Sequence, residues 1–209
     1  ERVRAKAGRY PYVLQLLARI YDGLGDLEAL AALLPDLRRH RVDGPVELDE
    51  LEARVYNDLM ERAAVTGDAA ELKDLWKRYP ARLREMDAVQ LKHLEALLAC
   101  DETASVEKEV VRRLKKNWQP ALVDLYGRIP RTGAHKQLAT AEGWLKQHRD
   151  DPVLLLCLGR LAMAEREWGK ARDYLERSHA LRPGEEVCLE LGRLLTAVGD
   201  HAAAAAVFL

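Results

Sequence analysis

Six histidines and three cysteines are the first candidates in this sequence for binding a metal ion or acting as nucleophiles. The histidines never occur as His-x3-His or His-Glu-x-x-His, and Cys100, Cys157 and Cys188 include no Cys-x-x-Cys pair. Glycine loops that cradle phosphate and the Gly-x-Ser-x-Gly elbow are also missing from the sequence. Cys-His catalysis stays open, although the pattern below places Cys157 inside a packed helix. We predict no catalytic, cofactor-binding or metal-binding residue, and a protein that is not an enzyme.

Arginine recurs at one position of a repeated pattern, at Arg19, Arg160 and Arg193. We predict that these residues, with Asn57 at a neighbouring position of the pattern, line a partner-binding groove and hold acidic side chains or a terminal carboxylate. The alternative is that the arginines pair within their own chain, with Glu61, Asp22 or Glu190. If they are groove residues, replacing Arg160 and Arg193 together by Glu should leave stability nearly unchanged.

The pattern itself is clearest over residues 152–183. With Pro152 as position 1, Leu158-Gly159 falls at 7 and 8, Ala171 at 20, Leu175 at 24 and Pro183 at 32. The pattern returns 33 residues later, where Leu191-Gly192 and Ala204 repeat Leu158-Gly159 and Ala171, and Phe208 takes the position at which the pattern prefers an aromatic residue. This spacing is typical of tetratricopeptide repeats, in which two antiparallel helices approach closely at small residues. We also expect Trp76 and Phe208, at position 24, to be core residues.

The repeats predict an all-α fold, a right-handed solenoid of antiparallel helix pairs in a single domain spanning 1–209. The clearest repeats are 11–41, 53–80, 152–183 and 185–209, and 87–117 and 118–148 are degenerate pairs. Gly-Asp dipeptides at 25–26, 67–68 and 199–200 are expected to form turns, because Gly adopts positive φ and Asp caps the next helix.

Charge argues against nucleic acid as a partner, and hydropathy argues against a membrane span within this sequence. With 33 basic and 34 acidic residues, the net charge is −1, which argues against a nucleic-acid binder. The basic cluster of Arg112, Arg113, Lys115 and Lys116 alternates with apolar positions and is interpreted as a solvated helix face. The sequence contains no run of 18 apolar residues, which is the length that a membrane-spanning helix needs. An odd number of separated cysteines favours free thiols in a reducing compartment.

Four segments of the last third carry a more specific resemblance. Residues 138–145, 148–154, 158–161 and 168–176 read LATAEGWL, HRDDPVL, LGRL and WGKARDYLE. Together with Leu33-Leu34-Pro35 and the Gly-Asp turns, they closely resemble the HemY family over essentially the whole chain, most specifically over 136–183.

The resemblance implies a bacterial inner-membrane protein with two N-terminal transmembrane helices followed by a tetratricopeptide domain, of which this sequence would be the domain alone, on the cytoplasmic side. It implies a link to late haem (protoporphyrin) biosynthesis and no settled enzymatic activity. The function we expect is a non-catalytic protein-interaction scaffold whose partners are terminal haem-pathway enzymes. The alternative is a porphyrin- or haem-binding carrier or regulatory module.

Overall fold

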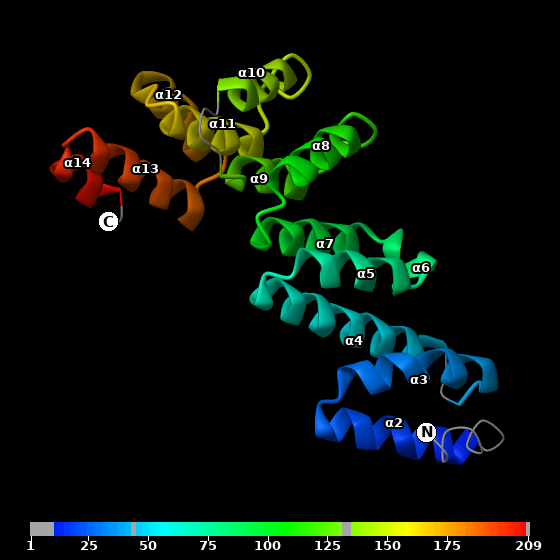
Figure 1. Ribbon diagram of the computed structural model, residues 1–209. Coiled ribbons are helices and arrows are strands. Elements are labelled where there is room, and N and C mark those ends of the chain that lie inside the picture. Colours follow the sequence, from blue (N-terminus) through cyan, green and yellow to red (C-terminus); the bar gives the residue numbers. More distant parts are fainter. Residues whose placement is uncertain (1–10, 43–44, 131–134, 208–209) are drawn as a thin grey trace. The chain divides into compact units, whose positions relative to one another are not determined.

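The computed structural model describes residues 11–42, 45–130 and 135–207, and its regular elements in these ranges are thirteen helices without a strand. Figure 1 labels the helices in chain order. The prediction of an all-α fold is confirmed. The right-handed solenoid and the single domain over 1–209 stay predictions. None of the described helices is both long enough and apolar enough to cross a membrane.

The helices fall into two compact units, which are described separately. Unit 1, residues 1–102, contains α2 (Pro11–Leu24), α3 (Leu27–His40), α4 (Pro45–Thr66), α5 (Ala69–Arg78), α6 (Ala81–Arg84) and α7 (Asp87–Ala99). Unit 2, residues 103–209, contains α8 (Thr103–Leu114), α9 (Pro120–Arg128), α10 (His135–Trp144), α11 (Pro152–Ala164), α12 (Trp168–Leu181), α13 (Glu185–Ala197) and α14 (His201–Ala206).

The three Gly-Asp turns form as the sequence predicts. Gly25, Gly67 and Gly199 have φ values of 66°, 70° and 82°, in the left-handed region that favours glycine. Each following aspartate accepts a hydrogen bond from a backbone N–H of the next helix, as from Ala29 to Asp26 and from Ala203 to Asp200. These contacts satisfy N–H groups that the first helical turn leaves without a partner.

The pair α11–α12 matches the clearest repeat, and its seam is closed at Gly159. A Cβ atom at Gly159 would lie 2.5 Å from both Cγ and Cδ2 of Leu175, so glycine is required for this approach. The small residue therefore accommodates Leu175 directly, while Ala171 is buried beside it. On another side of α11, a Cβ at Gly127 of α9 would lie 3.0 Å from the Cα of Cys157.

The segments predicted as degenerate pairs form helices near the expected bounds. Within unit 1, α7 packs on α4 and α5, and within unit 2, α8 packs on α9. In the segment 118–148, both α9 and α10 pack on α11. A period in the sequence identifies which face of a helix is apolar, but not which neighbour covers that face.

Trp76 is not the fully buried core residue that the repeat pattern predicts. It is half-buried and stacks on His93, with ring centroids 3.8 Å apart and an interplanar angle of 2°. The nearby Tyr79 is buried instead and donates a hydrogen bond from its hydroxyl to Oδ1 of Asn57. Phe208, the other expected core aromatic, lies outside the described residues.

Helix α2 has a second apolar face. Leu14 and Ala18 are buried on the side that packs on α3. Four large apolar side chains at intervals of four residues remain exposed, and these form the outer stripe of α2: Tyr12, Leu16, Ile20 and Leu24. Residues four apart lie on one side of a helix, so the stripe is continuous along α2.

Gly159→Leu is expected to destabilise the protein by about 1–3 kcal/mol or more, because the new side chain would occupy the volume of Leu175. The midpoint of urea unfolding, followed by circular dichroism, should fall accordingly. Gly169→Leu is the matched control, since nothing lies within 4 Å of a Cβ at Gly169 on α12. Equal midpoints for the two variants would contradict the close approach.

Arg166→Gly should stabilise the protein by about 1 kcal/mol, because Arg166 has φ 59° in the turn between α11 and α12, where an L-residue is strained. Arg166 is exposed, so the substitution removes little packing. The melting temperature should rise for this variant and fall for Gly199→Arg, which introduces the same strain at an equivalent turn. A lower melting temperature for Arg166→Gly would refute the argument.

Candidate partner-binding groove

Two of the four predicted groove residues meet in unit 2. Arg160 of α11 and Arg193 of α13 line an open groove of about 610 Å³, together with Arg128 of α9. The remaining lining residues are mostly apolar or small: Gly127, Met163, Ala164, Trp168, Glu190 and Ala197. We call this surface the basic groove.

An alternating chain of charges crosses the basic groove and connects three helices. Asp124 accepts from Nη1 of Arg160 at 2.6 Å and from Nε of Arg128 at 3.0 Å. Glu190 accepts through Oε1 from Nε of Arg160 at 2.9 Å and from Nη1 of Arg193 at 3.1 Å. The order Arg128, Asp124, Arg160, Glu190, Arg193 is the ion ladder, with three positive and two negative charges.

The middle of the ladder is buried and its ends are exposed. The side chains of Arg160 and Glu190 are 13% and 8% exposed, whereas that of Arg193 is 67% exposed. Burial lowers the pKa of the Arg160 guanidinium, but the hydrogen bonds to Asp124 and Glu190 outweigh it, so this pKa lies above its usual range. Arg160 thus links α9, α11 and α13 through its ion pairs, while Arg193 presents N–H groups to solvent.

Intramolecular pairing, the alternative considered for the arginines, is therefore present at both Arg160 and Arg193, and both pair with Glu190. Replacing Arg160 by Glu would bring three carboxylates together in a largely buried place. We no longer expect the double replacement of Arg160 and Arg193 to leave stability unchanged, and Arg193 is the residue suited to a binding test.

Sequence reasoning did not find Asp124 and Arg128. They lie four residues apart on α9, the spacing that places an acid and a base side by side on a helix. Because α9 does not align with the repeat pattern, the pattern assigns neither residue a groove position. The spacing of four residues between Asp124 and Arg128 was the one feature of the sequence that could have indicated this ion pair.

The other two predicted groove residues lie in unit 1. Arg19 is exposed on α2. Asn57 of α4 is half-buried and lines a smaller pocket of about 240 Å³, together with Met60, Glu61 and Lys92. Burial raises the pKa of Tyr79 to about 12, so its hydroxyl remains protonated as the donor to Asn57.

Asp22, considered as a partner for the arginines, pairs with Arg54 at 2.8 Å.

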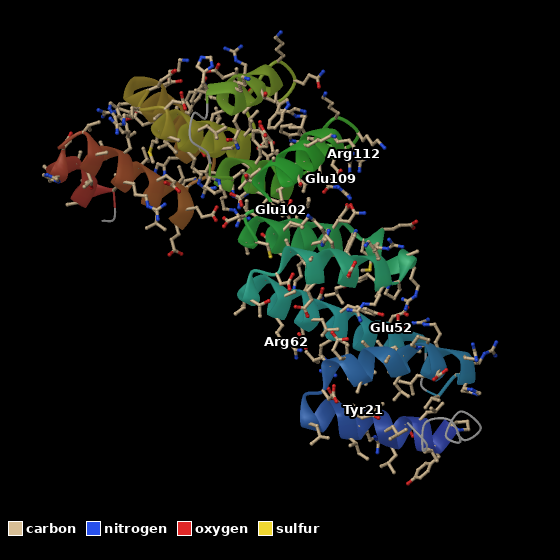
Figure 2. All side chains as sticks on the ribbon, in the orientation of Figure 1. Tyr21, Glu52, Arg62, Glu102, Glu109 and Arg112 are labelled. Atoms are coloured by element: carbon tan, nitrogen blue, oxygen red, sulfur yellow. The ribbon has the colours of Figure 1, made fainter. Side chains whose placement is uncertain are left out.

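A second ion cluster, in unit 1, is neutral. Glu52, labelled in Figure 2, is 3% exposed and contacts Arg38 and Arg82. Asp49 pairs with the same two arginines, and the hydrogen bond from Arg38 lowers the pKa of its carboxyl group. Two acids and two bases cancel, so this cluster joins α3, α4 and α6 without providing charge for a partner.

The two arginines of the basic cluster, both on α8, also pair within their own helix. Arg112 and Arg113 both pair with Glu109 at 2.6 Å, and Glu109 and Arg112 are labelled in Figure 2. This pairing supports the interpretation of a solvated helix face.

Candidates for metal or thiol chemistry are weak in the described part of the chain. No group of three His, Cys, Asp or Glu residues there is arranged to hold a metal ion. Cys157 is fully buried, and burial raises the pKa of its thiol, which disfavours the reactive thiolate.

Arg160→Met should destabilise the protein by about 3 kcal/mol, since Asp124 and Glu190 would lose the cation that compensates their burial. Arg193→Met, at the exposed end of the ladder, should change the stability by less than about 0.5 kcal/mol. Urea unfolding measures both values. Adding Asp124→Asn and Glu190→Gln to Arg160→Met should recover much of the loss; if recovery fails, the destabilisation does not come from uncompensated charge.

Comparison with known proteins gives a consistent set of relatives. No family model matches the chain. Curated proteins named "Protein HemY" from Escherichia coli K12, Escherichia coli O157:H7 and Shigella flexneri are each 24% identical to it over 163 residues. The match covers 78% of this chain and 41% of each relative. The resemblance found in the sequence is confirmed: the chain is a distant relative of the proteins named HemY.

Proposed function

We propose that this chain is a non-catalytic protein-interaction module associated with haem biosynthesis, and that its basic groove binds an acidic segment of a partner protein. The likeness to proteins named HemY supports the association with haem biosynthesis. The packing of α11 on α12 and of α13 on α14 in unit 2 supports an interaction module, because repeated helix pairs expose extended surfaces suited to protein segments. Within this proposal, the partners are terminal haem-pathway enzymes.

The exposed end of the ion ladder is the observation that carries the proposal. Glu190 fixes the position of Arg193, yet two-thirds of the Arg193 side chain remains accessible. An oriented guanidinium loses less conformational freedom on binding a carboxylate than a free one does. Arg128, 43% exposed at the other end of the ladder, adds a second cation to the same groove.

We also propose that the module belongs to a membrane-tethered protein of the bacterial inner membrane and faces the cytoplasm. The family resemblance supports this arrangement, with the tether preceding the repeats. Protease protection in spheroplasts would test the side: cleavage of the repeats from outside the inner membrane would contradict it.

Arg193→Glu should weaken the binding of a fluorescein-labelled peptide rich in Asp and Glu by about tenfold or more, because a charge-assisted hydrogen bond becomes a repulsion. Fluorescence anisotropy measures the affinity, and binding should also weaken with added salt. Circular dichroism should show that helicity is unchanged.

Arg172→Glu on α12 is the matched control, since Arg172 is 56% exposed and pairs with Glu176 four residues away. Equal losses for the two variants would indicate non-specific attraction rather than recognition by the groove. Failure of acidic peptides to bind the unchanged protein would contradict the proposed function. In the same protein, haem or protoporphyrin should cause no spectral shift, and a shift would favour the porphyrin-binding alternative.

A further inference from the structure

A second pocket, of about 360 Å³, lies on the same three helices as the basic groove. On α9 the pocket is lined by Pro120 and Ala121, and the groove by Gly127 and Arg128. On α11 the pocket is lined by Val153 and Leu156, and the groove by Arg160 and Met163. On α13 Val187 lines the pocket and Arg193 the groove. The two hollows thus follow one another along α9, α11 and α13.

The walls of this second pocket are mainly apolar. We call it the anchor pocket and define it by Pro120, Ala121, Val153, Leu156 and Val187. Its volume is near the lower end of the roughly 300–1,000 Å³ found for ligand pockets, and it suits one bulky apolar side chain. Asp124 lines the anchor pocket and also pairs with Arg160, so this residue belongs to both the pocket and the ion ladder.

The two hollows differ in charge. The anchor pocket carries the exposed carboxylates of Glu185 and Glu186 and the guanidinium of Arg182. The basic groove carries the three arginines of the ion ladder, which pair with Asp124 and Glu190, and Arg193 is its most exposed cation. An acidic side chain is therefore attracted to the groove and disfavoured beside the pocket, which fixes how a charged segment can lie along the helices.

The helix geometry sets the spacing between the two hollows. Val153 and Arg160 are seven residues apart on α11, which corresponds to about 10 Å at 1.5 Å per residue. An extended chain covers that distance in about three residues at roughly 3.3 Å each. One short extended segment can therefore reach both hollows.

We propose that the anchor pocket and the basic groove together bind one extended partner segment, with a bulky apolar residue in the pocket and an acidic residue about three positions away in the groove. This inference rests on the proposed function and specifies the partner sequence that the groove recognises. The apolar residue supplies affinity by desolvation, and the charges set the orientation.

The test uses fluorescein-labelled peptides that contain a pair of Asp residues in a Gly-Ser background, with Leu placed one, three or six residues from the nearer Asp. Leu at a spacing of three should bind roughly tenfold more tightly than Ala at that position. Leu at spacings of one and six should give little gain. Equal affinity at all spacings would overturn the inference.

Ala121→Phe fills the mouth of the anchor pocket at an exposed position and should abolish the gain from Leu while leaving binding of the Ala peptide unchanged. Ala139→Phe, at an exposed position of α10, is the matched control and should retain the gain. If Ala121→Phe retains the gain, or Ala139→Phe loses it equally, the anchor pocket is not the site.

The two proposals fail in different ways. If acidic peptides bind through Arg193 with no preference for Leu, the anchor inference is wrong and the proposed function stands. If no acidic peptide binds at all, both are wrong.

Discussion

Helix α11 is apolar on almost every side, and this constraint determines how unit 2 is built. A helix with apolar residues all round must be covered by neighbours, and α9, α10, α12 and α13 all contact it. Gly159 admits Leu175 of α12, and Gly127 allows α9 to approach Cys157. Arg160 is the one charged residue in α11. Because a buried charge must be paired, its position requires the carboxylates that α9 and α13 provide.

The groove is thus a consequence of how that charge is neutralised. Asp124 and Glu190 neutralise Arg160, and each holds a further arginine at the surface. Guanidinium groups stay protonated at any physiological pH, so the positive character of the groove does not depend on a titration. The neutral cluster around Glu52 joins helices in the same way but presents no surplus charge. The exposed Arg193 at the end of the ladder distinguishes a surface that can attract a partner from one that only joins helices.

The sequence predicted those features that depend on local residue types. Gly-Asp turns require positive φ and a side-chain acceptor, and both requirements can be read from the dipeptide. Gly159 was identified because only a small residue fits a close seam. The partners of α7, α9 and α10 were not predictable, since an apolar face is compatible with several neighbours. The ion ladder and the anchor pocket combine side chains from α9, α11 and α13, so their assembly could not be deduced from any one repeat.

The outer stripe of α2 favours adsorption of unit 1 to apolar surfaces. Tyr12 and Leu24 are about three-quarters exposed, and Leu16 and Ile20 nearly half. Burying a leucine or isoleucine side chain completely contributes about 1.5–3 kcal/mol. Adsorption of the stripe onto an apolar surface is therefore favourable. An air–water interface or a plastic wall offers such a surface without any specific recognition. Unit 1 should therefore adsorb through α2, and surface losses from dilute solution will follow the area of the vessel rather than the protein's folding stability.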